Sequence, residues 1–66
     1  MKNTLRVERA IKNITQEELA KAVGVSRQTI NAMELGKYAP SVILALKIAR
    51  HFEKPLEAIF SLEESD

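Results

Sequence analysis

One short stretch of the chain carries side chains that suit the edges of nucleic-acid bases. Arg27 can donate to guanine O6 and N7, whereas the amides of Gln28 and Asn31 can pair with adenine N6 and N7. The methyl groups of Thr29 and Ala32 can contact a thymine methyl. Taken alone, each of these is also an ordinary exposed helix residue, so the hypothesis of base contacts depends on their sharing one edge of a rigid element.

The surrounding sequence predicts two short helices joined by a tight turn. The segment 15–18, Thr-Gln-Glu-Glu, is a capping box that begins the first helix, and Gly24 ends it. Ser26 caps the second helix, which runs to about Leu35. The residues expected to pack the two helices together are Leu19, Ala20, Val23, Ile30 and Met33. This arrangement is a helix-turn-helix over residues 15–35, whose second helix is expected to enter the major groove.

Three further helices complete an all-α prediction. The first spans roughly residues 4–12, and two later helices begin near the prolines at positions 40 and 55. Their inward apolar residues are expected to be Leu44, Ala45, Ile48, Ala49, Phe52, Leu56, Ile59 and Phe60. No run of residues alternates in the pattern of a strand. We therefore predict one compact five-helix domain over residues 1–66, with a short acidic tail at 61–66 and no effector-binding or enzymatic domain.

Charge is divided unevenly along the chain, although the net charge is only +1. Residues 1–37 carry seven Lys or Arg against four Glu, whereas residues 38–66 carry three basic residues against five acidic ones. This division favours contact of the N-terminal part with a polyanion and places the acidic end away from it. A solvated surface with chance asymmetry explains the same numbers equally well.

Several classes of chemistry find no support in the sequence. The absence of Cys excludes a disulfide, a thiolate metal site and a cysteine nucleophile. His51 has no partner at metal-ligand spacing, and no catalytic constellation or glycine-rich phosphate loop occurs, so we expect no enzyme activity, metal, cofactor or small-molecule ligand. The first ten residues lack the apolar stretch of a signal peptide or membrane helix, so the expected location is the cytoplasm.

The residues described so far resemble the Cro/Xre type of helix-turn-helix regulators found in prokaryotes. The segments that carry the resemblance are residues 15–20, 23–31, 34, 36–38 and 40–41, followed by the apolar pattern from Leu44 to Phe60. This resemblance covers nearly the whole chain. It implies a lambda-repressor-like fold with double-stranded DNA as the partner.

The resemblance also implies roles for individual residues. It implies that Arg27, Gln28 and Asn31 face the bases. The expected phosphate contacts are Gln16, Ser26, Lys37, Tyr38 and Ser41, of which Ser26 is also the expected cap of the second helix. From its position alone, Gln16 fits a phosphate donor and a plain first-turn polar residue equally well.

Two further expectations concern the first helix. The resemblance implies a structural ion pair between Arg9 and Glu34, which would tie the first helix to the end of the third. Glu8 stands where members of the family often carry an apolar residue. We therefore expect the first helix to pack less completely or to shift its buried face toward Val7.

The expected function is sequence-specific DNA binding, most simply repression by a homodimer that occludes a promoter at a pseudo-palindromic operator. The expected dimer interface consists of Ile43, Ile59, Phe60 and Leu62. The alternative is a protein-interaction module, such as a coactivator or anti-repressor, that uses the same fold without reading bases. The operator, the regulated genes, the sign of regulation, the signal and any toxin partner stay open at this point.

Overall fold

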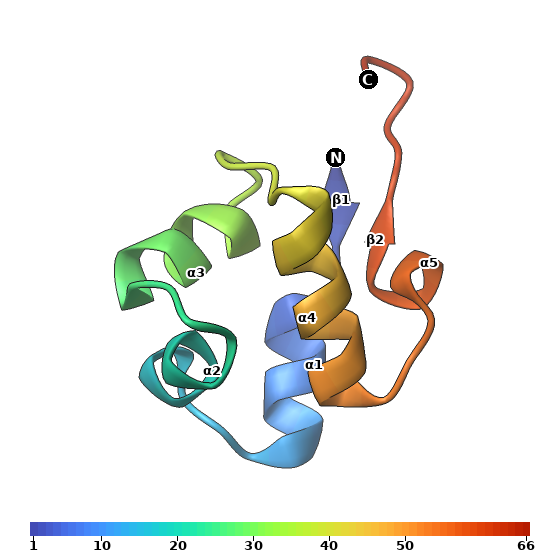
Figure 1. Ribbon diagram of the computed structural model, residues 1–66. Coiled ribbons are helices and arrows are strands. Elements are labelled where there is room, and N and C mark those ends of the chain that lie inside the picture. The colour runs from blue at the N-terminus through green and yellow to red at the C-terminus, as the bar shows by residue number, and fades with distance from the viewer.

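The computed structural model describes residues 1–66 and contains five helices and two very short strands (Figure 1). The helices are α1 Leu5–Lys12, α2 Gln16–Val23, α3 Arg27–Glu34, α4 Val42–Phe52 and α5 Leu56–Ile59. The strands are β1 Lys2–Asn3 and β2 Phe60–Ser61, which pair antiparallel with Asn3 opposite Phe60. The all-α prediction is confirmed, and the strand pair is an addition, because two-residue strands are too short to show an alternating pattern.

Side-chain caps set the start of three helices. The Thr15 hydroxyl accepts from the Glu18 N–H at 3.0 Å, and the Glu18 carboxylate accepts from the Thr15 N–H at 2.8 Å, which completes the capping box of α2. Ser26 and Ser41 cap α3 and α4 in the simpler way, each accepting one backbone N–H through its hydroxyl. These bonds fix where the two helices of the helix-turn-helix begin.

The turns between helices use left-handed residues. Gly24 ends α2 with a φ of 79°, and its N–H donates to the Ala20 carbonyl. Gly36 follows α3 with a φ of 74°. The N–H groups of Gly36 and Lys37 donate to the carbonyls of Met33 and Ala32, which is the Schellman arrangement. The end of α3 and the loop that follows it are therefore held by backbone hydrogen bonds.

The core lies where α4 crosses the other helices, near the centre of the molecule (Figure 1). Its thirteen buried apolar residues are Leu5, Leu19, Ala20, Val23, Ile30, Met33, Leu44, Ala45, Ile48, Ala49, Phe52, Ile59 and Phe60. All the residues expected to pack α2 against α3 are among them. The helix-turn-helix is thus fixed to the domain through its inner faces. None of the helices has the length and apolar character needed to cross a membrane.

The expectation for Glu8 requires correction. Val7 stays 57% exposed, so the buried face of α1 has not shifted toward it. Glu8 itself is buried and accepts from the Lys54 ammonium at 2.8 Å. The charged residue occupies the inward position because Lys54, at the turn before α5, neutralises it there.

Two of the four residues expected at a dimer interface belong to the core. Ile59 and Phe60 are only 2% and 7% exposed in a single chain, because α5 and β2 close over the end of α4. Ile43 and Leu62 are 69% and 80% exposed. Of the expected interface residues, therefore, only these two offer apolar surface to another molecule.

Candidate nucleic-acid interface

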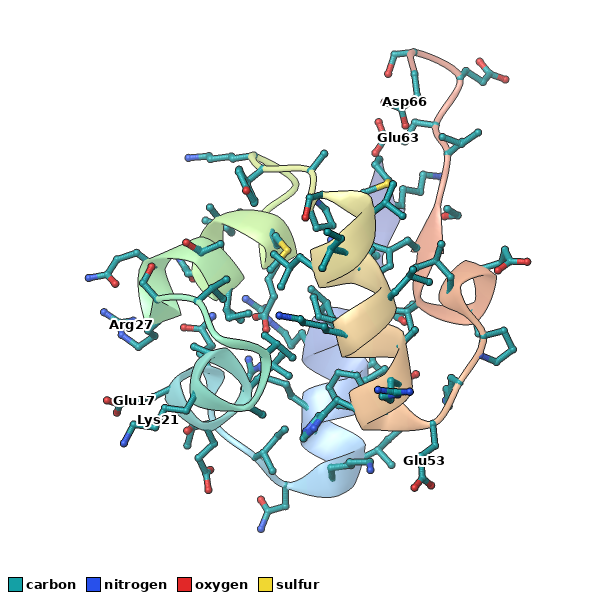
Figure 2. The ribbon with its side chains drawn as sticks, in the orientation of Figure 1. Glu17, Lys21, Arg27, Glu53, Glu63 and Asp66 are labelled. Atoms are coloured by element: carbon teal, nitrogen blue, oxygen red, sulfur yellow. The ribbon has the colours of Figure 1, made fainter.

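The outer edge of α3 carries the side chains expected to contact bases. Arg27 and Gln28 are exposed at the N-terminal end of the helix, and Asn31 is exposed one turn later. Arg27 projects from the edge of the molecule into solvent (Figure 2). Residues three and four apart lie on one face of a helix, so the three side chains form a single stripe.

Thr29 and Ala32 lie at the margin of this stripe. Both are half-buried, whereas Arg27, Gln28 and Asn31 are exposed. The Thr29 hydroxyl is 2.9 Å from the Ser26 hydroxyl, and the two share a hydrogen bond. The structure thus divides the five candidate residues into three exposed polar ones and two flanking small ones.

The residues expected to hold phosphates lie at helix ends around α3. The hydroxyls of Ser26 and Ser41 accept from the N–H groups of Thr29 at 3.2 Å and Leu44 at 3.1 Å. Lys37 and Tyr38 are exposed in the loop between α3 and α4, and Lys37 forms no ion pair. Their positions leave a lysine and a phenol at the surface beside the end of α3.

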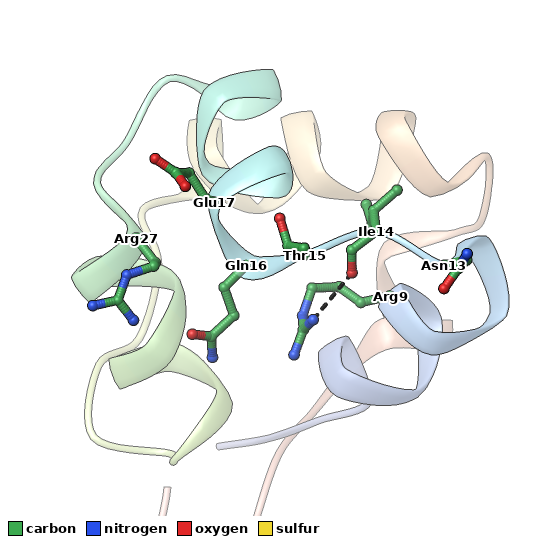
Figure 3. A pocket seen from close by; sticks show the side chains of 7 residues that line it. All are labelled: Arg9, Asn13, Ile14, Thr15, Gln16, Glu17 and Arg27. Atoms are coloured by element: carbon green, nitrogen blue, oxygen red, sulfur yellow. Dashed lines mark hydrogen bonds between the residues drawn. The ribbon is translucent and has the colours of Figure 1, made fainter.

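Arg9 and Glu34 meet in a two-point ion pair that joins α1 to the end of α3. Arg9 Nε lies 2.6 Å from Glu34 Oε2, and Arg9 Nη2 lies 3.0 Å from Oε1. A third guanidinium nitrogen, Nη1, donates to the Ile14 carbonyl at 3.1 Å, as Figure 3 shows. The paired geometry is that of a bidentate arginine-carboxylate contact, which fixes direction as well as charge.

The surroundings of this pair hold both groups in their charged forms. The hydrogen bond to Glu34 raises the pKa of Arg9, against the opposing effect of burial. Burial acts to raise the pKa of Glu34, whose side chain is only 1% exposed. The hydrogen bonds from Arg9 and Gln16, together with the charges of Arg9 and Arg6, outweigh that effect and hold the pKa of Glu34 below its ordinary value.

Gln16 connects this ion pair to the outer edge of α3. Its Nε2 donates to Glu34 Oε1 at 3.1 Å and to Asn31 Oδ1 at 3.1 Å. No local pattern indicates the contact with Asn31, because the two residues are 15 positions apart and lie on different helices. The link depends on how α2 and α3 cross.

A polar hollow of about 490 Å³ opens beside these residues, where α1, α2 and α3 approach one another (Figure 3). The residues that line it are Arg9, Asn13, Ile14, Thr15, Gln16, Glu17 and Arg27. The backbone N–H groups of Gln16 and Glu17 have no acceptor, as expected for the first turn of a helix. A surface with free N–H groups and arginine side chains is suited to an anionic partner.

The acidic tail lies apart from this surface. Glu63 and Asp66 lie at the upper right of Figure 2, away from Arg27 at the left edge, and Glu63 lines a separate hollow with Leu35 and Gly36 at the other end of α3. Asp66 accepts from the Glu63 N–H at 2.8 Å and lies 2.9 Å from the N-terminal ammonium. A polyanion at the N-terminal end of α3 would therefore lie away from these acidic groups.

Comparison with known proteins identifies the family. Residues 5–59 match the family model described as Helix-turn-helix. The chain is 56% identical over 66 residues to an uncharacterized HTH-type transcriptional regulator of Methanocaldococcus jannaschii, and 47% identical over 66 residues to YgzD, another such protein, from Bacillus subtilis; both comparisons cover 100% of each chain. A third such regulator, from Archaeoglobus fulgidus, is 52% identical over 66 residues, with 93% of its own length covered. The chain belongs to the Cro/Xre-type helix-turn-helix family of transcriptional regulators.

Proposed function

We propose that this protein binds double-stranded DNA sequence-specifically as a homodimer and represses transcription by occupying a promoter. Helix α3 reads the major groove, with Arg27, Gln28 and Asn31 on base edges. The observation that carries the proposal is the exposed polar stripe of these three side chains on a helix whose inner face is fixed in the core. Its place of action is the cytoplasm, where a prokaryotic chromosome lies.

Phosphate contacts on both sides of α3 hold the domain on the duplex. Lys37 supplies a free ammonium beside the end of α3, and Tyr38 and Ser41 supply hydroxyls from the same loop. At the other end, Gln16 and Glu17, whose backbone N–H groups are unpaired, line the hollow together with Arg27. Such contacts supply affinity and position without reading sequence.

The homodimer forms through the exposed apolar residues of α4 and the tail. Val42, Ile43 and Leu46 are exposed on the outer side of α4, and Leu62 is exposed just after β2. These residues make up half of the exposed large hydrophobic side chains of a 66-residue chain, and burying them against a second copy removes an unfavourable surface. A two-fold dimer then presents two reading helices to a pseudo-palindromic site.

A binding selection with random duplexes tests the proposal. We expect the protein to enrich a pseudo-palindromic motif with half-sites about one helical turn, roughly 10 base pairs, apart. An interaction module with the same fold would enrich no motif, and that outcome would contradict DNA reading. A motif without symmetry would support base reading and contradict the homodimer.

A further inference from the structure

We infer that Gln16 fixes the direction of the Asn31 side-chain amide, so that Asn31 presents hydrogen-bond donors to the major groove and favours guanine over adenine. The inference rests on the proposed reading function of α3 and adds to it the chemistry of one base position. Its basis is a chain of hydrogen bonds that runs from the buried ion pair to the exposed edge of α3.

The first link is the Glu34 carboxylate. Arg9 holds it with two charge-assisted hydrogen bonds of 2.6 and 3.0 Å, which keep it ionised although its side chain is only 1% exposed. An ionised carboxylate can only accept hydrogen bonds. The Gln16 atom that lies 3.1 Å from Glu34 Oε1 must therefore be the amide nitrogen, which settles the direction of the Gln16 amide.

The second link runs from Gln16 to Asn31. The Gln16 amide nitrogen carries two hydrogens, and one of them is used by Glu34. The other points to an atom of Asn31 at 3.1 Å, which must be an acceptor and is therefore Oδ1. The reverse direction of the Asn31 amide would set two donors against each other. The ion pair thus determines the direction of both amides.

The consequence concerns what Asn31 offers to DNA. Pairing with adenine requires Oδ1 to accept from N6 while Nδ2 donates to N7. Here Gln16 occupies one of the two lone pairs of Oδ1 and turns this oxygen toward α2, whereas Nδ2 has no partner within the protein and lies on the exposed stripe of α3. Guanine presents two acceptors, O6 and N7, to a free donor group. The structure therefore favours guanine at the position that Asn31 contacts.

The same bonds define the role of Gln16. Both hydrogens of its amide are occupied, by Glu34 and Asn31, so the side chain has no N–H left for a phosphate. Gln16 is a positioning residue that acts through Asn31, in place of the phosphate contact expected for its side chain. The backbone N–H of Gln16 remains free for a phosphate.

Binding selections with random duplexes test the inference on the full chain. The Asn31→Ala variant locates the base pair that Asn31 reads, as the position whose preference it removes. At that position wild type is expected to favour guanine over adenine by about tenfold, and Gln16→Met, which releases Oδ1, is expected to bring the ratio close to one. Lys21→Met, an exposed position elsewhere on α2, is the matched control and should keep the wild-type ratio.

Each other outcome is decisive. A wild-type preference for adenine, or an unchanged ratio in Gln16→Met with a thermal melt showing the variant folded, overturns the inference and leaves DNA reading intact. If Asn31→Ala leaves the motif unchanged, the inference is likewise overturned and DNA reading is left intact. If wild type enriches no motif, the proposed function fails and the inference fails with it.

Discussion

At the scale of single residues, the Glu34 carboxylate connects folding to recognition. Its side chain accepts from Arg9 of α1 and from Gln16 of α2, and it stands at the end of α3. Removing one partner of a buried ion pair leaves the other charge buried and unpaired, which strongly destabilises the fold. This small cluster therefore holds three helices in one orientation.

Removing one partner of the pair should be more damaging than removing both. We expect Arg9→Met and Glu34→Leu each to lower the free energy of unfolding by roughly 3 to 5 kcal/mol, because each leaves one charge buried and unpaired. The double variant is expected to lose clearly less than the sum of the two. Urea unfolding of all four proteins measures the coupling, and additive losses would mean that the residues do not interact.

The ionisation of Glu34 should also be visible in the response to acid. Because its pKa is lowered in the folded state, its contribution to stability is fully present above its ordinary value of 4.5 and is lost as the pH falls through the lower folded value. We expect the free energy of unfolding of wild type to fall below about pH 4.5 more steeply than that of Glu34→Gln.

A second acidic group requires a control in this experiment. The pKa of Asp66 is also lowered, first by the hydrogen bond from the Glu63 N–H and then by the N-terminal ammonium. The comparison is therefore made in an Asp66→Asn background, by thermal melts between pH 2.5 and 6. Parallel curves for wild type and Glu34→Gln in that background would contradict the account.

At the scale of elements, the ends of the helices show how local sequence directs the chain. The C-cap residues that follow α1 and α4 are Asn13 and Glu53, with φ values of 56° and 55°. The left-handed conformation costs roughly 1 to 2 kcal/mol for an ordinary residue, whereas Asn adopts it more readily. Glu53 forms no side-chain hydrogen bond and points away from the domain (Figure 2), so nothing offsets its cost.

Replacing Glu53 with glycine should therefore stabilise the protein. We expect Glu53→Gly to raise the free energy of unfolding by about 0.5 to 1 kcal/mol, after allowing for the greater flexibility of Gly in the unfolded chain. In a domain of this size that corresponds to a rise in Tm of about 2 to 8 °C. Asn13→Gly is the matched control and should change Tm little. An equal rise in both variants, or none in Glu53→Gly, would contradict the argument.

The elements differ in how far the sequence alone could reveal them. The start of α2 and its end at Gly24 depend on residues within a few positions, so the capping box and the glycine predicted them. The β1–β2 pair joins residues 2–3 to residues 60–61, and Glu8 meets Lys54 across 46 positions. Such contacts produce no local pattern in the sequence, because they form only once α4 and α5 pack against α1.

The candidate site also combines features that follow from nearby residues with contacts that require the folded chain. The stripe formed by Arg27, Gln28 and Asn31 follows from helical spacing and could be predicted from residue types. The Arg9–Glu34 pair was expected only from the family resemblance, since both residues read as surface positions by themselves. The bond between Gln16 and Asn31 could not be predicted, because it requires the crossing geometry of α2 and α3.

At the scale of the whole molecule, the main feature is the apolar surface left outside a small core. The thirteen core residues close one domain, yet Ile43 and Leu62 stay 69% and 80% exposed. A chain of 66 residues has limited stability of its own, and association is a common way to increase it. The dimer proposed here would bury this surface.

A charge placed in this surface should separate the two copies. We expect Ile43→Glu and Leu62→Glu to shift wild-type dimer toward monomer at micromolar concentration, because each would bury an unpaired carboxylate at the interface. Val7→Glu, exposed on α1, is the control and should leave the dimer unchanged. Phe60 is unsuitable for this test, because it lies in the core. Sedimentation velocity gives the result, and monomeric wild type would contradict the proposed dimer.

The central claim is that α3 reads base sequence while the residues around it hold the phosphates. Its most direct test measures the affinities of wild type, Arg27→Ala, Gln28→Ala and Lys37→Ala for the selected duplex and for its single base-pair variants. We expect Arg27→Ala and Gln28→Ala each to lose roughly 1 to 3 kcal/mol on the selected duplex and to lose discrimination at one or two positions per half-site. Lys37→Ala should weaken binding to every duplex alike and lower the salt slope by about one. Unchanged base preference in both Arg27→Ala and Gln28→Ala would contradict the assignment of α3 as the reading helix.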